Sequence, residues 1–387
     1  MKKTDVYAYY FPNWHVDKLN ESWHGKNWTE WELLKCARPR FEGHEQPLVP
    51  LWGYEDESDP NVMAKKIDTA LQYGIDGFIF DFYYYQQETY RARCIDEGFL
   101  QAPNNEKIKF AIMWCNHDAI YAHPAPRFDA CPVLRSGKLT EEQFVVMTDM
   151  YIKKYFSRPN YIRVNGKILF AIYNVVRFCK DFGSVENARR IVDGFRQRVR
   201  DAGLGEVWLC CHAPDVKSAY LGKAGEEVVA DQAQANALLK GLGVDQGVRY
   251  WWPTHHCDDP RFEEYALTVD YKDYVDGGID IYYTDLEFFD IPVAASISVG
   301  LDNSPRTIQS ETYENLEVYP WGPIVVGRDL TEFERGLRAI KEIAERDDYQ
   351  GNFITINSWN EWTEGNYLEP DTVYGYGFLE RIKKIFK

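Results

Sequence analysis

The sequence of 387 residues has no hydrophobic run long enough to cross a membrane and no excess of basic residues. A membrane-spanning helix needs about 18 or more apolar residues in succession, and no segment approaches that length. Lys and Arg together number 44 and Asp and Glu 60, so the formal net charge is −16 at pH 7. Nucleic acids and anionic membrane surfaces bind basic footprints, so we expect neither as a partner.

The chain also lacks the residue spacings of several common sites. Its eight cysteines contain no Cys-x-x-Cys, which indicates reduced, buried thiols. There is no Gly-x-x-x-x-Gly-Lys, no Gly-x-Gly-x-x-Gly after a strand and no Gly-x-Ser-x-Gly, so NTPase, dinucleotide and serine-hydrolase hypotheses lack support. The amino terminus has no apolar signal segment, and we expect a cytoplasmic protein.

One run, His-His-Cys-Asp-Asp at residues 255–259, superficially resembles a metal site. Adjacent ligands rarely surround one ion, and the flanking prolines indicate an irregular loop, so we interpret this run as structural. We therefore expect no cofactor and no metal.

Aromatic residues are abundant, with 27 Tyr, 21 Phe and 12 Trp making up 16% of the chain. Aromatic rings that line an open cleft can stack on the faces of sugars. A large aromatic core explains the same composition equally well, so composition alone does not choose between a binding cleft and a core.

Strand-like and helix-like segments alternate along the chain. Strands are expected at residues 5–11, 74–84, 109–116, 167–174, 206–212, 279–285 and 292–299 and from residue 353, and helices at 59–73, 140–156, 185–202, 330–345 and 375–386. About eight such units predict an α/β fold, a (β/α)8 TIM barrel. The pattern is weakest over 213–278.

No linker rich in Gly, Ser or Pro divides the chain, so residues 1–387 are expected to form a single catalytic domain. Residues 13–57 lack a sustained period and contain several tryptophans and prolines. Loops of this length usually form lids or walls of functional sites, so we expect long loops at the carboxyl-end mouth of the barrel.

The stretch 353–371 carries the sharpest chemical signal. Alternating β-branched residues lead into a loop that contains Glu361 and Glu364, and these side chains converge only if the chain turns directly after Asn360. Gly365 favours such a turn. Two neighbouring carboxyls among tryptophans acquire unequal pKa values, so one can donate a proton while the other acts as a base. The alternative, a pair of solvated loop residues, does not need these polar and aromatic neighbours.

In a barrel, the residues at the carboxyl ends of the strands converge on one mouth. Each has a structural alternative: His212, for example, suits a satisfied core histidine, and Arg306 suits either an anionic group or a site carboxylate. Together they form a polar and aromatic set. We predict that the substrate contacts Tyr10, Asp81, Tyr83, Trp114, Asn116, His117, Tyr173, His212, Tyr283, Asp302, Arg306, Asn360 and Trp362.

Several motifs resemble those of a known family. The motifs are Tyr-Tyr-Phe-Pro-Asn-Trp-His at 9–15, Trp-Thr-Glu-Trp at 28–31, Phe-Glu-Gly-His-Glu-Gln-Pro at 41–47, Tyr-Gly-Ile-Asp-Gly-Phe at 73–78, Asp-Asn-Ser-Pro-Arg at 302–306, Trp-Asn-Glu-Trp-Thr-Glu-Gly at 359–365 and Leu-Glu-Pro-Asp at 368–371. They are similar to those of the WbsX-type proteins. That group is often labelled glycosyltransferase and is itself similar to glycoside hydrolase family 99.

The resemblance implies a (β/α)8 barrel that acts on glycans, with Glu361 and Glu364 as its catalytic pair. The family 99 hydrolases cleave α-mannosidic linkages with retention. Their first glutamate is thought to deprotonate the sugar 2-hydroxyl, which attacks the anomeric carbon, while the second protonates the leaving oxygen. By position, Glu361 would be the base and Glu364 the general acid/base. Direct attack by a carboxylate stays open as the alternative.

Three functions follow as hypotheses. The first is a retaining glycoside hydrolase for α-linked, manno-configured or related oligo- or polysaccharides, which needs no cofactor. The second is a nucleotide-sugar-dependent glycosyltransferase in polysaccharide synthesis, which needs a diphosphate site, although neither a Gly-rich loop nor a basic cluster is present. The third is a non-catalytic carbohydrate-binding barrel, which has no need of two carboxyls directed at one point.

Overall fold

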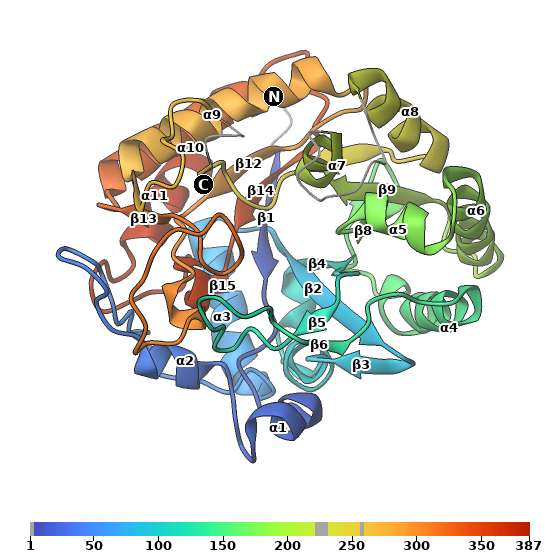
Figure 1. Ribbon diagram of the computed structural model, residues 1–387. Coiled ribbons are helices and arrows are strands. Elements are labelled where there is room, and N and C mark those ends of the chain that lie inside the picture. The colour runs from blue at the N-terminus through green and yellow to red at the C-terminus, as the bar shows by residue number, and fades with distance from the viewer. Residues whose placement is uncertain (1–3, 221–230, 256–258) are drawn as a thin grey trace.

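The computed structural model describes residues 4–220, 231–255 and 259–387, and it shows parallel strands surrounded by helices (Figure 1). The spatial order of the strands is β10 (Gln246–Val248), β9 (Val207–His212), β8 (Lys167–Ile172), β4 (Lys109–Trp114), β2 (Gly77–Tyr85), β1 (Asp5–Tyr10), β14 (Phe353–Asn357) and β12 (Ala295–Ser298). Neighbours in this order pair in parallel. The expected TIM barrel is confirmed.

The ring closes between β10 and the residues just before β12. Gly247 forms an isolated parallel bridge with Val293. The Gly247 N–H donates to the Pro292 carbonyl at 2.8 Å, and the Ala294 N–H donates to the Gly247 carbonyl at 3.0 Å. This seam is short because β10 has three residues, whereas β2 and β4 pair over six residues of each strand.

Helices form the outer layer of the barrel (Figure 1). They are α3 (Pro60–Tyr73), α4 (Glu141–Tyr151), α5 (Val175–Asp181), α6 (Val185–Asp201), α7 (Ala213–Tyr220), α8 (Gln232–Leu242), α9 (Tyr271–Phe288), α10 (Leu330–Ala344) and α11 (Gly377–Phe386). Their starts follow from capping: the side chains of Asp59, Thr140 and Ser184 accept backbone N–H groups in the first turns of α3, α4 and α6. The helices predicted at 59–73, 140–156, 185–202, 330–345 and 375–386 are confirmed. No helix of the described residues is long and apolar enough to cross a membrane.

The sixth predicted strand, at 279–285, is wrong. These residues lie inside α9, and β10 takes the place of the sixth strand. Their β-branched and aromatic side chains have high strand propensity. The buried positions are nevertheless spaced by one, three and four residues, as on one face of a helix. They are Tyr271, Tyr274, Val275, Gly277, Gly278, Ile281, Tyr282 and Asp285.

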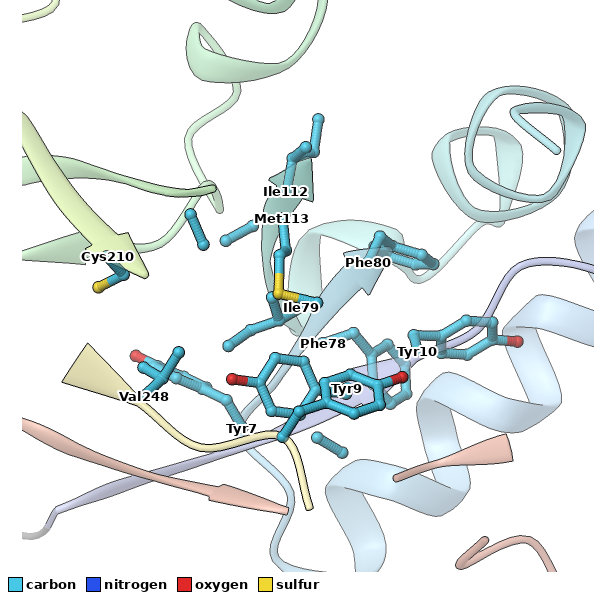
Figure 2. Close-up of a cluster of buried hydrophobic side chains, with 14 of the residues drawn as sticks. Tyr7, Tyr9, Tyr10, Phe78, Ile79, Phe80, Ile112, Met113, Cys210 and Val248 are labelled. Carbon is cyan, nitrogen blue, oxygen red and sulfur yellow. The ribbon is translucent and has the colours of Figure 1, made fainter. Parts of the chain in front are cut away.

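Side chains alternate between the two faces of the strands, and this alternation decides which residues reach the mouth. Tyr9 and Tyr10, both labelled in Figure 2, are neighbours in β1 and therefore point to opposite faces of the strand. The Tyr9 ring lies 4.7 Å from the ring of Tyr250, a residue that follows β10. The Tyr10 ring instead packs on Phe80 at 4.8 Å, and its hydroxyl donates to Glu57 near α3. Tyr9 therefore faces the barrel interior and Tyr10 the helical layer.

Candidate active site

A cavity of about 750 Å³ lies at the carboxyl ends of the strands. Some of its wall comes from the irregular stretch 13–57, which holds the short helices α1 (Lys18–His24) and α2 (Trp31–Cys36) and contributes Trp23 and His24. The predicted residues that line this cavity are Asp81, Tyr83, His117, Tyr173, Arg306, Glu361 and Glu364.

The loop after β14 brings the two glutamates together. It forms the short strand β15 (Asn360–Glu361) and then a 3₁₀ turn at Trp362–Glu364. Side chains three residues apart share one side of such a turn. Gly365 ends the turn at φ +62°, and a Cβ there would lie 2.8 Å from the Cβ of Asp302. The turn predicted after Asn360 is therefore present, and it needs glycine at its end.

Arg306 joins both glutamates. Its Nη2 lies 3.0 Å from Oε2 of Glu361, and its Nη1 donates to Oε1 of Glu364. The Nε group donates to Oε1 of a third carboxylate, Glu30, at 3.0 Å. The guanidinium is 3% exposed, so these charge-assisted bonds act in a desolvated environment. Of the two interpretations of Arg306, the structure shows pairing with site carboxylates.

Glu30 was not predicted from the sequence as a site residue. It precedes α2, is fully buried and accepts hydrogen bonds from Thr363 and Asn13 as well as Arg306. Burial alone would raise the pKa of Glu30, but the surrounding charges and hydrogen bonds, the charge of Arg306 foremost, together outweigh burial and hold the pKa well below its usual range. Glu30 is therefore a permanent anion that fixes the guanidinium.

Asp81, Tyr250 and Glu361 form a second chain of contacts. The Tyr250 hydroxyl lies 2.8 Å from Oδ2 of Asp81 and 3.2 Å from Oε1 of Glu361. Burial raises the pKa of Asp81 from 3.8 to about 8, and burial together with Glu364 raises that of Glu361 well above its usual value. One phenol proton cannot satisfy two ionised carboxylates. A carboxyl proton is therefore shared along this chain.

A buried ion-pair network lies behind the loop. Lys66 contacts Glu57 at 2.5 Å and Glu369 at 2.6 Å. Glu57 also accepts from the side-chain amide of Asn360, and Glu369 accepts from the indole N–H of Trp362. Burial raises the pKa of Glu57 to about 7. Asn360 and Trp362 flank Glu361, so this network orients the loop that carries Glu361. Its charged residues do not line the cavity.

Several residues that were predicted to bind substrate do not line the cavity of the described structure. The direction in which each side chain leaves its strand or helix explains this. Tyr10 and Trp114 point outward from their strands, and Trp114 packs on Phe144 at 5.7 Å. Tyr283 lies on α9 with 42% of its surface exposed. These three predictions are corrected: the first two residues occupy the outer face of the barrel wall, and the third is on a helix.

Others hold the mouth together. Asn116 bonds the backbone N–H and carbonyl of Asn174, each at 2.8 Å. His212 is fully buried against Tyr173 and Trp251. Asp302 accepts a hydrogen bond from Gln46 and contacts His44. The side-chain amide of Asn360 bonds both the backbone N–H and the carbonyl of Phe11. The Trp362 ring stacks on Tyr367. All five residues were predicted to contact the substrate, but in the structure they bond to or pack on neighbouring residues of the mouth and do not line the cavity.

Sequence reasoning missed Glu30, Tyr250 and Arg91, which line or support the cavity. A signal for Glu30 existed in the echo between Trp28-Thr-Glu-Trp31 and Trp359-Asn-Glu-Trp362. Tyr250 begins an aromatic run two residues after β10, so it would have been found only with that strand recognised.

No group of three or more His, Cys, Asp or Glu side chains within residues 4–220, 231–255 and 259–387 is arranged to hold a metal ion. Of the run at 255–259, residues 256–258 lie outside the described residues. His255 contacts Glu317.

Comparison with known proteins begins with the sequence. A family model described as Glycosyltransferase WbsX matches residues 6–382. The chain belongs to the WbsX family. This confirms the resemblance indicated by the motifs. Another similar protein, the uncharacterized protein WxcX of Xanthomonas campestris pv. campestris, is 24% identical over 385 residues, which cover 97% of this WbsX-family chain and 49% of that protein. The chain spans about half the length of the curated relatives it matches.

The WbsX-family barrel is also similar to solved structures. A GH99 endo-α-mannosidase from Bacteroides thetaiotaomicron has 14% identity, with 98% of this chain and 95% of that chain covered and a TM-score of 0.53. A glycoside hydrolase-like protein has 15% identity, with 100% and 95% covered and a TM-score of 0.57. At these identities the likeness establishes the fold, a TIM barrel that glycoside hydrolases also use.

Proposed function

We propose that this protein is a retaining glycoside hydrolase that acts on α-linked, manno-configured or related glycans. The observation that carries the proposal is the placement of Glu361 and Glu364 on one arginine, Arg306, in the wall of a cavity of about 750 Å³. Glycosidases of this kind use two carboxyls beside the scissile bond, one as an acid. A TIM barrel places such groups at the carboxyl ends of its strands.

In this proposal Glu361 is the base. A proton on Asp81 would be donated to the Tyr250 oxygen, and the Tyr250 hydroxyl would then donate to Glu361, which is left ionised. Glu361 takes the proton of the sugar 2-hydroxyl, and the resulting oxygen attacks the anomeric carbon. Direct attack by a carboxylate remains the alternative route.

Glu364 is the general acid/base. Its side chain is 18% exposed, more than the 5% of Glu361, so it is the member of the pair that water reaches more readily. It donates a proton to the leaving oxygen and then takes one from the water that attacks the anomeric carbon. This attack breaks the bond between the anomeric carbon and the 2-oxygen, and Glu361 returns its proton to the 2-oxygen, which restores the starting state. Arg306 orients both carboxylates without taking part in proton transfer.

The proposal is tested by mass spectrometry of products from a panel of α-mannosyl and α-rhamnosyl oligosaccharides. Wild type should release shorter sugars, and Glu364→Gln should slow this release by about 100- to 10,000-fold, the usual contribution of an acid/base residue. Glu317→Gln is the matched control, because Glu317 also lines the cavity but contacts His255 instead of Arg306. It should retain cleavage within a few-fold.

The family description names a glycosyltransferase, which is the second candidate. Nucleotide sugars are therefore added to parallel reactions. Elongation of the oligosaccharides only in their presence would replace hydrolysis with transfer. Binding of the panel with no change in either reaction would indicate a carbohydrate-binding barrel.

A further inference from the structure

Arg91 is the cavity arginine whose charge is least compensated. It follows the short strand β3 (Glu88–Tyr90), lines the cavity and is 6% exposed. Within the described part of the chain, its one carboxylate partner is Glu30, at 4.0 Å, which is longer than a hydrogen bond. The Nε–H of Arg91 is buried without any hydrogen-bond partner.

Glu30 is already engaged elsewhere. Its Oε1 accepts from Arg306 and Thr363, and its Oε2 accepts from Asn13. A single carboxylate therefore serves two arginines, and Arg306 holds it directly. The second arginine, Arg91, keeps its Nε–H without a partner in the wall of the cavity. A buried donor without a partner costs free energy, so its retention calls for an explanation.

Each of the other cavity arginines has a carboxylate oxygen within 3.0 Å, although the Nε–H of Arg177 is likewise without a hydrogen bond. Their partners are Asp118 and Asp181 for Arg177, Asp285 for Arg249, and Glu30, Glu361 and Glu364 for Arg306. Burial lowers the pKa of His123 to about 3 and also lowers those of His24 and His117, so these histidines supply no positive charge at neutral pH. The fourth cavity histidine, His255, contacts Glu317. Among the described residues that line the cavity, Arg91 is therefore the arginine without a carboxylate at hydrogen-bond distance.

The surroundings hold Arg91 in place. Its guanidinium lies 4.5 to 4.8 Å from the rings of Phe11, Tyr83 and Tyr90. Its backbone has φ +62°, a left-handed conformation that is unfavourable for a side chain of this size, and the N–H donates to Asp17 at 3.1 Å. The chain thus accepts backbone strain and fixes the guanidinium on an aromatic platform, which preorganises it for a ligand.

We propose that Arg91 binds an oxyanion carried by the substrate sugar, so that the glycan accepted by this cavity is anionic. The planar guanidinium presents a fork of N–H donors that matches a carboxylate, as in a uronic acid, and also binds a phosphate or sulfate substituent. This inference rests on the proposed function for the class of ligand, a glycan.

The test is the affinity of the whole protein for methyl α-D-mannopyranoside and for its uronate, 6-phosphate and 6-sulfate forms, measured by ligand-observed NMR titration. Wild type should bind at least one anionic form about tenfold more tightly than the neutral glycoside, as expected for a charged hydrogen bond. Arg91→Met should remove this preference while leaving the neutral Kd within about twofold. Arg91→Lys keeps the charge but loses the fork, so it should retain part of the preference.

Arg177→Met is the matched control, because Arg177 also lines the cavity but is paired with Asp118. It should keep the preference. The proposal is overturned if the neutral glycoside binds as tightly as every anionic form, or if Arg177→Met removes the preference as fully as Arg91→Met. Tighter binding of inorganic pyrophosphate than of any anionic sugar, lost in Arg91→Met, would also overturn it and would point to a nucleotide-sugar donor.

Failure of the inference and failure of the proposed function give different results. An anionic preference without cleavage of any glycan would retain the Arg91 site and reject the hydrolase. Cleavage of neutral glycans without an anionic preference would do the reverse. Far-UV circular dichroism of each variant verifies folding, and Arg91→Lys tests the site if Arg91→Met does not fold.

Discussion

Asp81 shows at the scale of one residue how the barrel changes the chemistry of a side chain. Asp81 lines the cavity, and its Oδ2 accepts a hydrogen bond from the Tyr250 hydroxyl. Its Oδ1 is buried without a hydrogen-bond partner. Burial is the main cause that raises the pKa of this carboxyl to about 8. The folded protein therefore holds a proton at neutral pH that the unfolded chain releases.

This proton makes stability depend on pH, and Asp81→Asn removes the part of the dependence that belongs to Asp81. The stabilising contribution of Asp81 is complete below pH 3.8 and is lost as the pH rises toward about 8. Relative to Asp81→Asn, the wild type should lose unfolding free energy by up to about 1.4 kcal/mol for each pH unit in this window. Chemical denaturation of both proteins at several pH values between 5 and 7.5 measures the change.

Asp118→Asn provides the control. Burial opposes ionisation of Asp118, but its bonds with Arg177 and the Gly137 N–H outweigh burial and lower its pKa below 3.8. Its contribution is therefore fully present above pH 3.8, and the difference between wild type and Asp118→Asn should stay constant from pH 5 to 7.5. The same drift in both pairs of proteins would contradict the assignment to Asp81.

The sequence could predict the catalytic candidates better than their partners. Glu361 and Glu364 stand three apart beside a glycine, so local turn geometry brings them together. Glu30 meets the same arginine from more than 270 residues away in the chain, as the Arg306 to Glu30 contact shows. Contacts of this kind depend on strand order and on which face of a strand a side chain takes, neither of which a local pattern contains.

The helix α9 illustrates the scale of single elements. A β-propensity pattern in 279–285 concealed a helix whose buried face includes Gly278. A Cβ at Gly278 would lie 2.0 Å from Cδ2 of Trp252, a residue that is 1% exposed. The packing of the helix on this tryptophan needs glycine, so tertiary contact overrides local preference here.

Gly278→Ala should therefore destabilise the protein although alanine is the better helix former. Overpacking in a core costs about 1–3 kcal/mol, which exceeds the gain of up to about 1 kcal/mol in helix propensity. Gly194→Ala in α6 is the matched control, because the nearest atom to its added Cβ, on Arg198, is 3.8 Å away. It should be neutral or stabilising. Urea denaturation of both variants measures the effect, and equal stability would refute the packing argument.

The strand β10 was missed for a related reason. Gln246-Gly247-Val248 is too short to show alternation, and a glycine at its centre weakens any strand prediction. Seven of the barrel strands and five of the outer helices were predictable because longer runs carry clear periods and caps. The element that closes the ring was not predictable, because its strand character comes from the neighbours on each side.

At the scale of the whole molecule, the first barrel strand lies beside the last. β1 pairs with β14 from Asp5 opposite Phe353 to Ala8 opposite Ile356. Neither half of the chain can then complete a barrel alone, which supports the proposal of a single domain over residues 1–387. We expect one cooperative unfolding transition, with tryptophan fluorescence and far-UV circular dichroism giving the same denaturant midpoint. Two separate midpoints would indicate independent domains.

The short seam between β10 and the residues just before β12 is where the fewest backbone hydrogen bonds hold the ring of strands closed. Local opening occurs where few backbone bonds must break, so the amide protons of Gly247 and Ala294 should exchange with solvent well before those in the centre of β1. Tyr250 lies two residues beyond β10 and contacts Glu361. Opening of this seam would thus loosen the segment that holds Tyr250, and the protonation of Asp81 and Glu361, which the Tyr250 hydroxyl connects, would follow the opening.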